Sequence, residues 1–213
     1  MKKLGWVLFG VFSLLIGVYP VVYFLIDMKQ GLLGSKSEDL LQNEVWFWFF
    51  YQHIGFGAMT MLTGWTQFSR KLRVRNINIH KVLGKIYVIS VLLSGTAGLY
   101  LSFYATGGLI ASFGFGIMAV LWVITTFMAF ITVKKGEITA HQQWMIRSYA
   151  LCWAAVTLRI WLPTLQIGFG LDFISSYLIV SWLCWVPNLI VAELIILNGK
   201  SSRNTNISLS KSN

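Results

Sequence analysis

The chain has 213 residues, of which 56% are hydrophobic, 15% aromatic and only 11% charged. Soluble globular domains carry about 25% charged residues, and the mean hydropathy of +0.68 leaves no room for a separate water-soluble domain. Composition therefore predicts an integral membrane protein and excludes a disordered chain, a disulfide scaffold and a cytosolic enzyme.

Six apolar segments are long enough to cross a bilayer, because a spanning helix needs about 20 predominantly apolar residues. In chain order they are 4–26, 44–68, 83–105, 109–133, 143–167 and 172–198. We predict an all-α, polytopic transmembrane bundle of six helices that forms a single domain over 1–198. The Ser- and Asn-rich segment 199–213 has few apolar residues to bury and is predicted to be a disordered cytoplasmic tail.

The net charge of +10 comes from 17 Lys and Arg against 7 Asp and Glu. If the N-terminus is cytoplasmic, all of these basic residues fall in inside segments except Lys29, Lys36 and Arg159. Cytoplasmic loops of membrane proteins are enriched in Lys and Arg. The distribution of the basic residues therefore predicts a topology in which both termini are cytoplasmic. We expect a lipid bilayer as the partner of this chain and no nucleic acid.

Small and polar residues form stripes on three of the predicted helices. At helical spacing they share one face of each helix: His53, Gly57, Thr60, Gly64 and Gln67 on the second, His80, Gly84, Tyr87, Ser94 and Gly98 on the third, and His141, Ser148, Cys152, Arg159 and Gln166 on the fifth. All three histidines of the chain lie on these stripes. Two interpretations stay open, because such stripes serve close helix packing and intramembrane histidines also mark binding sites.

His80 and His141 lie at the cytoplasmic ends of their helices and are the candidate ligands of a metal or of haem iron. The candidate cofactor-binding residues around them are Gln67, Lys81, Lys85 and Arg147. The basic side chains could pair with haem propionates, a quinone oxygen or an anionic headgroup. The alternative is that both histidines lie in headgroup water.

His53 and Arg159 are predicted at a similar depth in the outer half of the membrane. Arginine stays charged in proteins, so Arg159 needs an acceptor there. Met118 on the fourth helix lies at a comparable depth and makes a His–Met iron site conceivable. Glu193, near the cytoplasmic end of the last helix, is interpreted as the ion-pair partner of Arg147 or Lys85, with a proton-carrying role as the alternative.

A string of spaced residues resembles a known family. It reads His53…Gly64-x-x-Gln67…His80-Lys81-x-x-Gly84-x-x-Tyr87…His141-x-x-Trp144-Met145-x-Arg147-Ser148…Arg159. It is similar to a bacterial family of predicted multi-pass membrane proteins classed as a domain of unknown function, over about 45–165. The resemblance implies a topology and a bacterial cell-membrane location, and it carries no established activity.

The chain is also similar, more weakly, to six-helix membrane cytochromes b of the ascorbate-reducing type. Those proteins carry one histidine on each of four central helices and pair the third helix with the fifth. The similarity implies a b-type haem between His80 and His141. The fourth helix of this chain has no histidine, so the outer haem site of that family is incomplete here.

Three hypotheses for function follow. The first is a redox protein with a b-type haem or a quinone at the His80/His141 site. The second is a small transporter or membrane assembly factor with an outer cavity at His53 and Arg159, although the sequence shows no pair of broken helices of the kind found in many transporters. The third is a structural or interaction protein whose polar stripes only join its helices. The sequence leaves the oligomeric state open.

Overall fold

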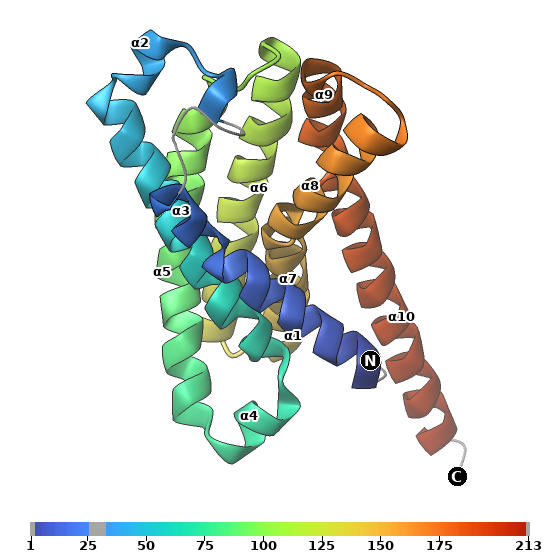
Figure 1. Ribbon diagram of the computed structural model, residues 1–213. Coiled ribbons are helices and arrows are strands. Elements are labelled where there is room, and N and C mark those ends of the chain that lie inside the picture. Colours follow the sequence, from blue (N-terminus) through green and yellow to red (C-terminus); the bar gives the residue numbers. More distant parts are fainter. Residues whose placement is uncertain (1–2, 26–32, 212–213) are drawn as a thin grey trace.

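The computed structural model describes residues 3–25 and 33–211, which form a bundle of helices without a strand (Figure 1). The α-helices are α1 (Lys3–Val18), α2 (Glu38–Leu41), α3 (Glu44–Gly64), α4 (Arg70–Arg75), α5 (Ile77–Ser102), α6 (Leu109–Lys134), α7 (Ile138–Cys152), α8 (Ala154–Pro163), α9 (Phe173–Leu183) and α10 (Val186–Lys211). Short 3₁₀ segments are η1 (Tyr19–Phe24), η2 (Leu33–Ser35) and η3 (Trp65–Phe68), and η4 (Thr164–Gly168) is a π-helical turn. The predicted all-α class is confirmed for this part of the chain.

Five stretches of the described chain are long and apolar enough to cross a membrane. They are Lys3–Tyr23, Ile77–Ser102, Leu109–Lys134, Ile138–Gly168 and Phe173–Gly199. The predicted second span corresponds to α3, which has 21 residues. It is not among the five, because Gln52, His53 and several Trp and Tyr side chains lower its hydropathy.

Some sequence predictions fall outside the described residues. These include the end of the first span at residue 26 and the outer-loop residue Lys29. At the other terminus, α10 continues to Lys211, past the predicted end of the last span at 198. Whether 199–213 is a disordered tail stays a prediction.

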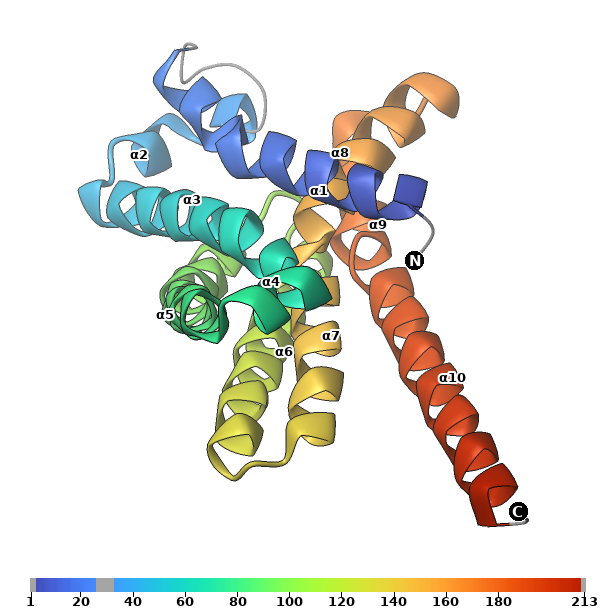
Figure 2. The same cartoon turned by 90° about the horizontal axis from the view of Figure 1, so that it is seen from below.

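Helices α5, α6 and α7 run antiparallel to their neighbours, with α6 packed against both α5 and α7 and α3 packed along α5. In Figure 1, α4 and the α6–α7 turn lie at one end of the bundle, while α2 and the α5–α6 turn lie at the other. In Figure 1, α1 passes in front of α3, with which it is in contact, and Figure 2 shows that α10 leans away from the rest. The basic helix α4 and the acidic helix α2 therefore lie at opposite ends of the bundle.

The stripes on α3 and α5 face each other in a fixed antiparallel register. The contacts are Gln67 with Gly84, Gly64 with Tyr87, Gly57 with Ser94, and His53 with Gly98. A Cβ on Gly64 would overlap the Tyr149 ring and lie 2.7 Å from Cε2 of Tyr87. Glycine at that position therefore lets two aromatic rings lie directly against the α3 backbone.

A buried hydrogen-bond network joins the helices in the middle of the bundle. The Tyr87 hydroxyl lies 2.7 Å from Ser148 Oγ, which lies 2.6 Å from Thr126 Oγ1. The Tyr149 hydroxyl lies 3.0 Å from Ser13 Oγ on α1. Since buried polar groups without partners are costly, these bonds fix the rotation of α1, α5, α6 and α7 about their axes.

Side-chain caps mark where several helices begin. Asn43 accepts a hydrogen bond from the Trp46 amide at the start of α3, and Asn76 does the same for Ile79 at the start of α5. Asp172 caps α9 at the Ser175 amide. Hydrogen bonds to Ser175 hold the pKa of the Asp172 carboxyl below its usual value, because they stabilise the ionised form.

Candidate functional site

Arg159 is a cation carried by α8, within the fifth predicted span. Its Nη1 donates to the Ala155 carbonyl at 2.9 Å, and its guanidinium carbon lies 4.2 Å from the centre of the Tyr19 ring. Its Nε is shielded from solvent and has no hydrogen-bond partner among the described residues. No described ion pair involves Arg159 either. The guanidinium therefore has a donor left over at a place where unsatisfied donors are costly.

Two tyrosines of η1 lie beside this guanidinium. Pro20, in the first turn of η1, suits a helix start because it has no N–H to satisfy. The turn brings Tyr19 and Tyr23 together, with ring centres 5.9 Å apart. Both lie within electrostatic reach of Arg159. An aromatic face attracts a cation, so η1 holds the arginine side chain inside the bundle.

His53 of α3 also interacts electrostatically with the arginine. Its Nδ1 is 2.9 Å from the Ser94 carbonyl, and Ser94 Oγ donates to the His53 carbonyl at 2.9 Å. A Cβ on Gly98 would lie 3.0 Å from the His53 ring, so this glycine makes room for the imidazole. With Nδ1–H donating to Ser94, a neutral ring keeps the lone pair on Nε2. Arg159 is within electrostatic reach of this ring.

The backbone next to Arg159 is irregular. Pro163 lies four residues further on and ends α8. Since proline has no N–H, it cannot donate to the Arg159 carbonyl in the normal helical pattern. The chain continues as the π-helical turn η4. π-turns are frequent at functional sites, and this one leaves backbone carbonyl groups near the arginine outside the α-helical ladder.

Each of the last two predicted spans contains one interruption of the helix, and the two interruptions contact each other. The first lies at Trp153 between α7 and α8, and the second lies between α9 and α10 at Cys184. Asn188 Nδ2 donates to the Ala150 carbonyl at 3.2 Å and to the Cys184 carbonyl at 2.9 Å. Thr157 Oγ1 also donates to the Cys184 carbonyl, at 2.5 Å. Side chains thus satisfy carbonyls that the interrupted helices leave open.

The contact between the two helix interruptions was not predicted from the sequence. The only local signal was Pro187 followed by Asn188 within the last apolar segment, since proline interrupts a helix and Asn bonds open carbonyls. The expectation that the chain has no pair of broken helices is wrong for the fifth and sixth predicted spans.

The inner histidines come from the first turns of α5 and α7. His141 Nδ1 lies 2.8 Å from the Ala129 carbonyl, which leaves Nε2 as the free nitrogen of a neutral ring. His80 Nδ1 is shielded from solvent without a described partner, and His141 is within electrostatic reach of it. The structure therefore brings the two predicted ligands into one region, while Lys81 and Lys85 are exposed.

The donor chemistry at this inner pair suits haem iron, because two neutral imidazoles are common axial ligands. The space is less suitable. The Gln67 amide oxygen fills the notch at Gly84, where a Cβ would lie 3.1 Å from it. Neither cavity described below is lined by His80 or His141. No group of three His, Cys, Asp or Glu side chains able to hold a metal occurs in the described chain.

Arg147 is paired with Glu193, as one of the two sequence interpretations expected. Its Nε and Nη2 donate to the two carboxylate oxygens at 2.5 and 2.8 Å. Its guanidinium carbon also lies 4.7 Å from the centre of the Trp144 ring. This bidentate pair joins α7 to α10 and occupies the guanidinium that the haem hypothesis assigns to propionates.

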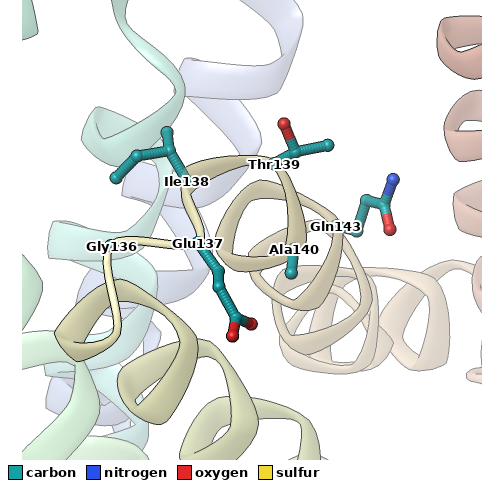
Figure 3. Close-up of a pocket in the computed structure, with 6 residues that line it drawn as sticks. All are labelled: Gly136, Glu137, Ile138, Thr139, Ala140 and Gln143. Atoms are coloured by element: carbon teal, nitrogen blue, oxygen red, sulfur yellow. The ribbon is translucent and has the colours of Figure 1, made fainter.

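A shallow hollow of about 560 Å³ surrounds the α6–α7 turn (Figure 3). Gly136 makes this turn with a φ of +78°. Figure 3 shows the Glu137 carboxylate and the side chains of Thr139 and Gln143 pointing in different directions. The polar groups do not converge on one point, as they would in a binding site.

An all-helical chain with these spans and intramembrane polar groups belongs to the class of polytopic membrane proteins. More particularly, it belongs to the family described as predicted membrane protein (DUF2306), whose model matches residues 50–196. This confirms the resemblance to an uncharacterised membrane family. The comparisons show no similarity to cytochromes b, and neither a curated protein nor a solved structure matches the chain.

Proposed function

We propose that the protein crosses the bacterial cell membrane six times, with α3 as the second crossing and both termini in the cytoplasm. At 1.5 Å per residue, a helix of the length of α3 extends about 30 Å, the thickness of the hydrocarbon core. The basic helix α4 and the α6–α7 turn with Lys134 and Lys135 lie at the same end of the bundle. The positive-inside rule makes that end cytoplasmic.

We further propose that the protein is a small membrane carrier that binds an anion at Arg159. The observation that supports this is the unpartnered, shielded Nε of an intramembrane arginine with no described ion pair. A bound anion would supply both the acceptor and the countercharge that the site lacks.

Each neighbour of Arg159 has a role in this proposal. The Tyr19 ring covers the guanidinium, and the hydroxyl groups of Tyr19 and Tyr23 can donate to the anion. His53 can take up a proton on Nε2, which would couple anion binding to proton binding at the same site. The paired helix interruptions at Trp153 and Cys184, which Thr157 and Asn188 bridge, resemble the discontinuous helices that form the sites of many transporters.

Anion binding is tested by thermal unfolding of the purified protein in chloride, phosphate or acetate. We expect at least one of these anions to raise the Tm of the unaltered protein and to leave that of Arg159→Gln unchanged. Arg75→Gln on α4 is the control, because it removes one positive charge from the cytoplasmic end. If every anion acts equally on all three proteins, Arg159 does not bind it. Flux of the stabilising anion into proteoliposomes then tests transport.

A second candidate function is redox activity with a b-type haem between His80 and His141. The observation that favours it is the hydrogen bond from His141 to the Ala129 carbonyl, since such bonds orient ligating imidazoles. The reduced-minus-oxidised spectrum of the purified protein should then contain a b-type band that His80→Ala and His141→Ala each remove. A colourless protein from haem-replete cells would reject this candidate.

A further inference from the structure

A groove of about 480 Å³ lies between α6, α7 and α10, where α10 leans away from the bundle (Figure 2). Its walls are almost wholly apolar, with Leu121 of α6, Trp144 of α7 and Trp185 at the start of α10 among them. Ile190 and Leu194 on its α10 side are 56% and 55% exposed, on the surface that a bilayer would cover. The groove is therefore accessible to a molecule dissolved in the membrane.

The charged groups of this groove are the paired side chains of Arg147 and Glu193, and Thr125 adds a hydroxyl to its lining. The side chain of Glu193 is 45% exposed and that of Arg147 is 21% exposed, so both can make a further hydrogen bond. Because the two charges already neutralise each other, the groove has no net charge to attract an anionic headgroup. A zwitterionic headgroup would have to bring two further charges into the groove, although the charges there are already paired with each other.

We propose that this groove binds a prenylated quinone or quinol from the bilayer. Such a molecule is neutral, has a flat ring, and carries an apolar tail that matches the apolar walls. The carbonyl oxygen of a quinone can accept a hydrogen bond from Arg147, and the hydroxyl of a quinol can donate one to Glu193. The proposal concerns binding alone and goes beyond the anion site, which lies on the other side of the interruption between α7 and α8.

The test is photo-crosslinking of the full-length protein, in nanodiscs of phosphatidylcholine, with an azido-quinone that carries a short prenyl tail. We expect crosslinked peptides from 185–194 and from 121–147. Unlabelled short-chain ubiquinone should compete for labelling, whereas added phosphatidylethanolamine or phosphatidylglycerol should not. Labelling that either phospholipid suppresses as well as ubiquinone does would overturn the proposal in favour of a lipid site.

Two isoleucines of α10 provide a matched pair of variants. Ile190 and Ile195 are 56% and 54% exposed, but only Ile190 lines the groove. We expect Ile190→Trp to fill the groove and reduce labelling at least tenfold, while Ile195→Trp leaves it unchanged. Equal labelling of the two variants, or equal loss in both, contradicts the proposal. Unchanged thermal unfolding of both variants shows that they fold.

Glu193→Gln tests the headgroup contact separately. It keeps the size of the side chain and an acceptor oxygen but removes the charge, so we expect several-fold weaker competition by the quinol form. Arg159→Gln should leave labelling of the groove unchanged. Failure of the anion carrier and failure of the quinone site are therefore distinguishable.

Discussion

At the scale of single residues, Lys36 joins the segment before α2 to the turn between α5 and α6. Its Nζ donates to the Tyr104 carbonyl at 2.5 Å and to Thr106 Oγ1 at 3.1 Å. Burial lowers the pKa of this amine from 10.5 to about 8, since desolvation disfavours the charged form. The folded protein therefore releases this proton before the unfolded chain does, and the free energy of unfolding rises between about pH 8 and 10.5.

The pKa of Lys36 gives the first prediction. An impermeant amine-acylating reagent applied to intact cells should label Lys36 with a half-maximal rate near pH 8, because the neutral amine is the nucleophile. Exposed Lys71 on α4 should stay unlabelled until the cells are opened. Mass spectrometry of the labelled peptides measures both. Labelling of Lys71 in sealed cells would place α4 outside and reverse the proposed orientation.

Gly64 gives the second prediction, and Gly55 on the same helix is its control. A methyl group at position 64 would collide with the rings of Tyr149 and Tyr87, whereas one at position 55 meets nothing within 4 Å. We expect Gly64→Ala to lower the free energy of unfolding by about 1–3 kcal/mol. Gly55→Ala should leave it unchanged or raise it slightly. Thermal unfolding in detergent compares them, and equal Tm values would show that the rings can move aside.

The sequence could predict which residues matter better than what they contact. Helical spacing placed His53, His80 and Arg159 on polar stripes, because that spacing depends only on helix geometry. The partner of Arg147 was also predictable, since Glu193 is one of few acidic residues in the apolar segments. The contact of Arg159 with Tyr19 was not predictable, because it depends on the angle at which α1 crosses the bundle.

At the scale of helices, the crossing of the two interruptions gives the third prediction. Asn188→Leu preserves the size of the side chain but removes the donor to the Ala150 and Cys184 carbonyls. Each buried carbonyl that is left unsatisfied costs about 1–3 kcal/mol. We therefore expect Asn188→Leu to lower the free energy of unfolding clearly. Val191→Leu, on the exposed side of α10, should have almost no effect. Hydrogen exchange at 150–157 should increase only in Asn188→Leu.

If exchange in that segment is unchanged, the interruptions do not depend on Asn188. Apolar length predicted the helices but not these interruptions, because they depend on hydrogen bonds between separate spans. Hydropathy does not place α3 among the five apolar stretches, because its aromatic residues include Trp and Tyr side chains that carry polar groups.

At the scale of the whole molecule, topology gives the fourth prediction. Fusions of alkaline phosphatase, which is active outside the cytoplasm, should be active after residue 36 and inactive after 75 and 136. A fusion of green fluorescent protein after residue 198 should fluoresce, because the proposed topology places that end in the cytoplasm. Activity after residue 75 would show that α3 does not cross the membrane, and the protein would then have the five spans that hydropathy alone indicates.

The register between α3 and α5 has a consequence for how the protein can move. His53 of α3 and Gln67 of the following segment η3 are 14 positions apart, a rise of roughly 22 Å, and each packs against a glycine of α5. The two helices therefore form a rigid unit that keeps the polar regions around His53 and Gln67 at a constant distance from each other. A one-residue insertion in either helix would turn its contacts by about 100° and break them all at once. Any conformational change that connects the polar regions at the two ends of the bundle must therefore involve a movement of the interrupted helices α7 to α10 relative to α3 and α5.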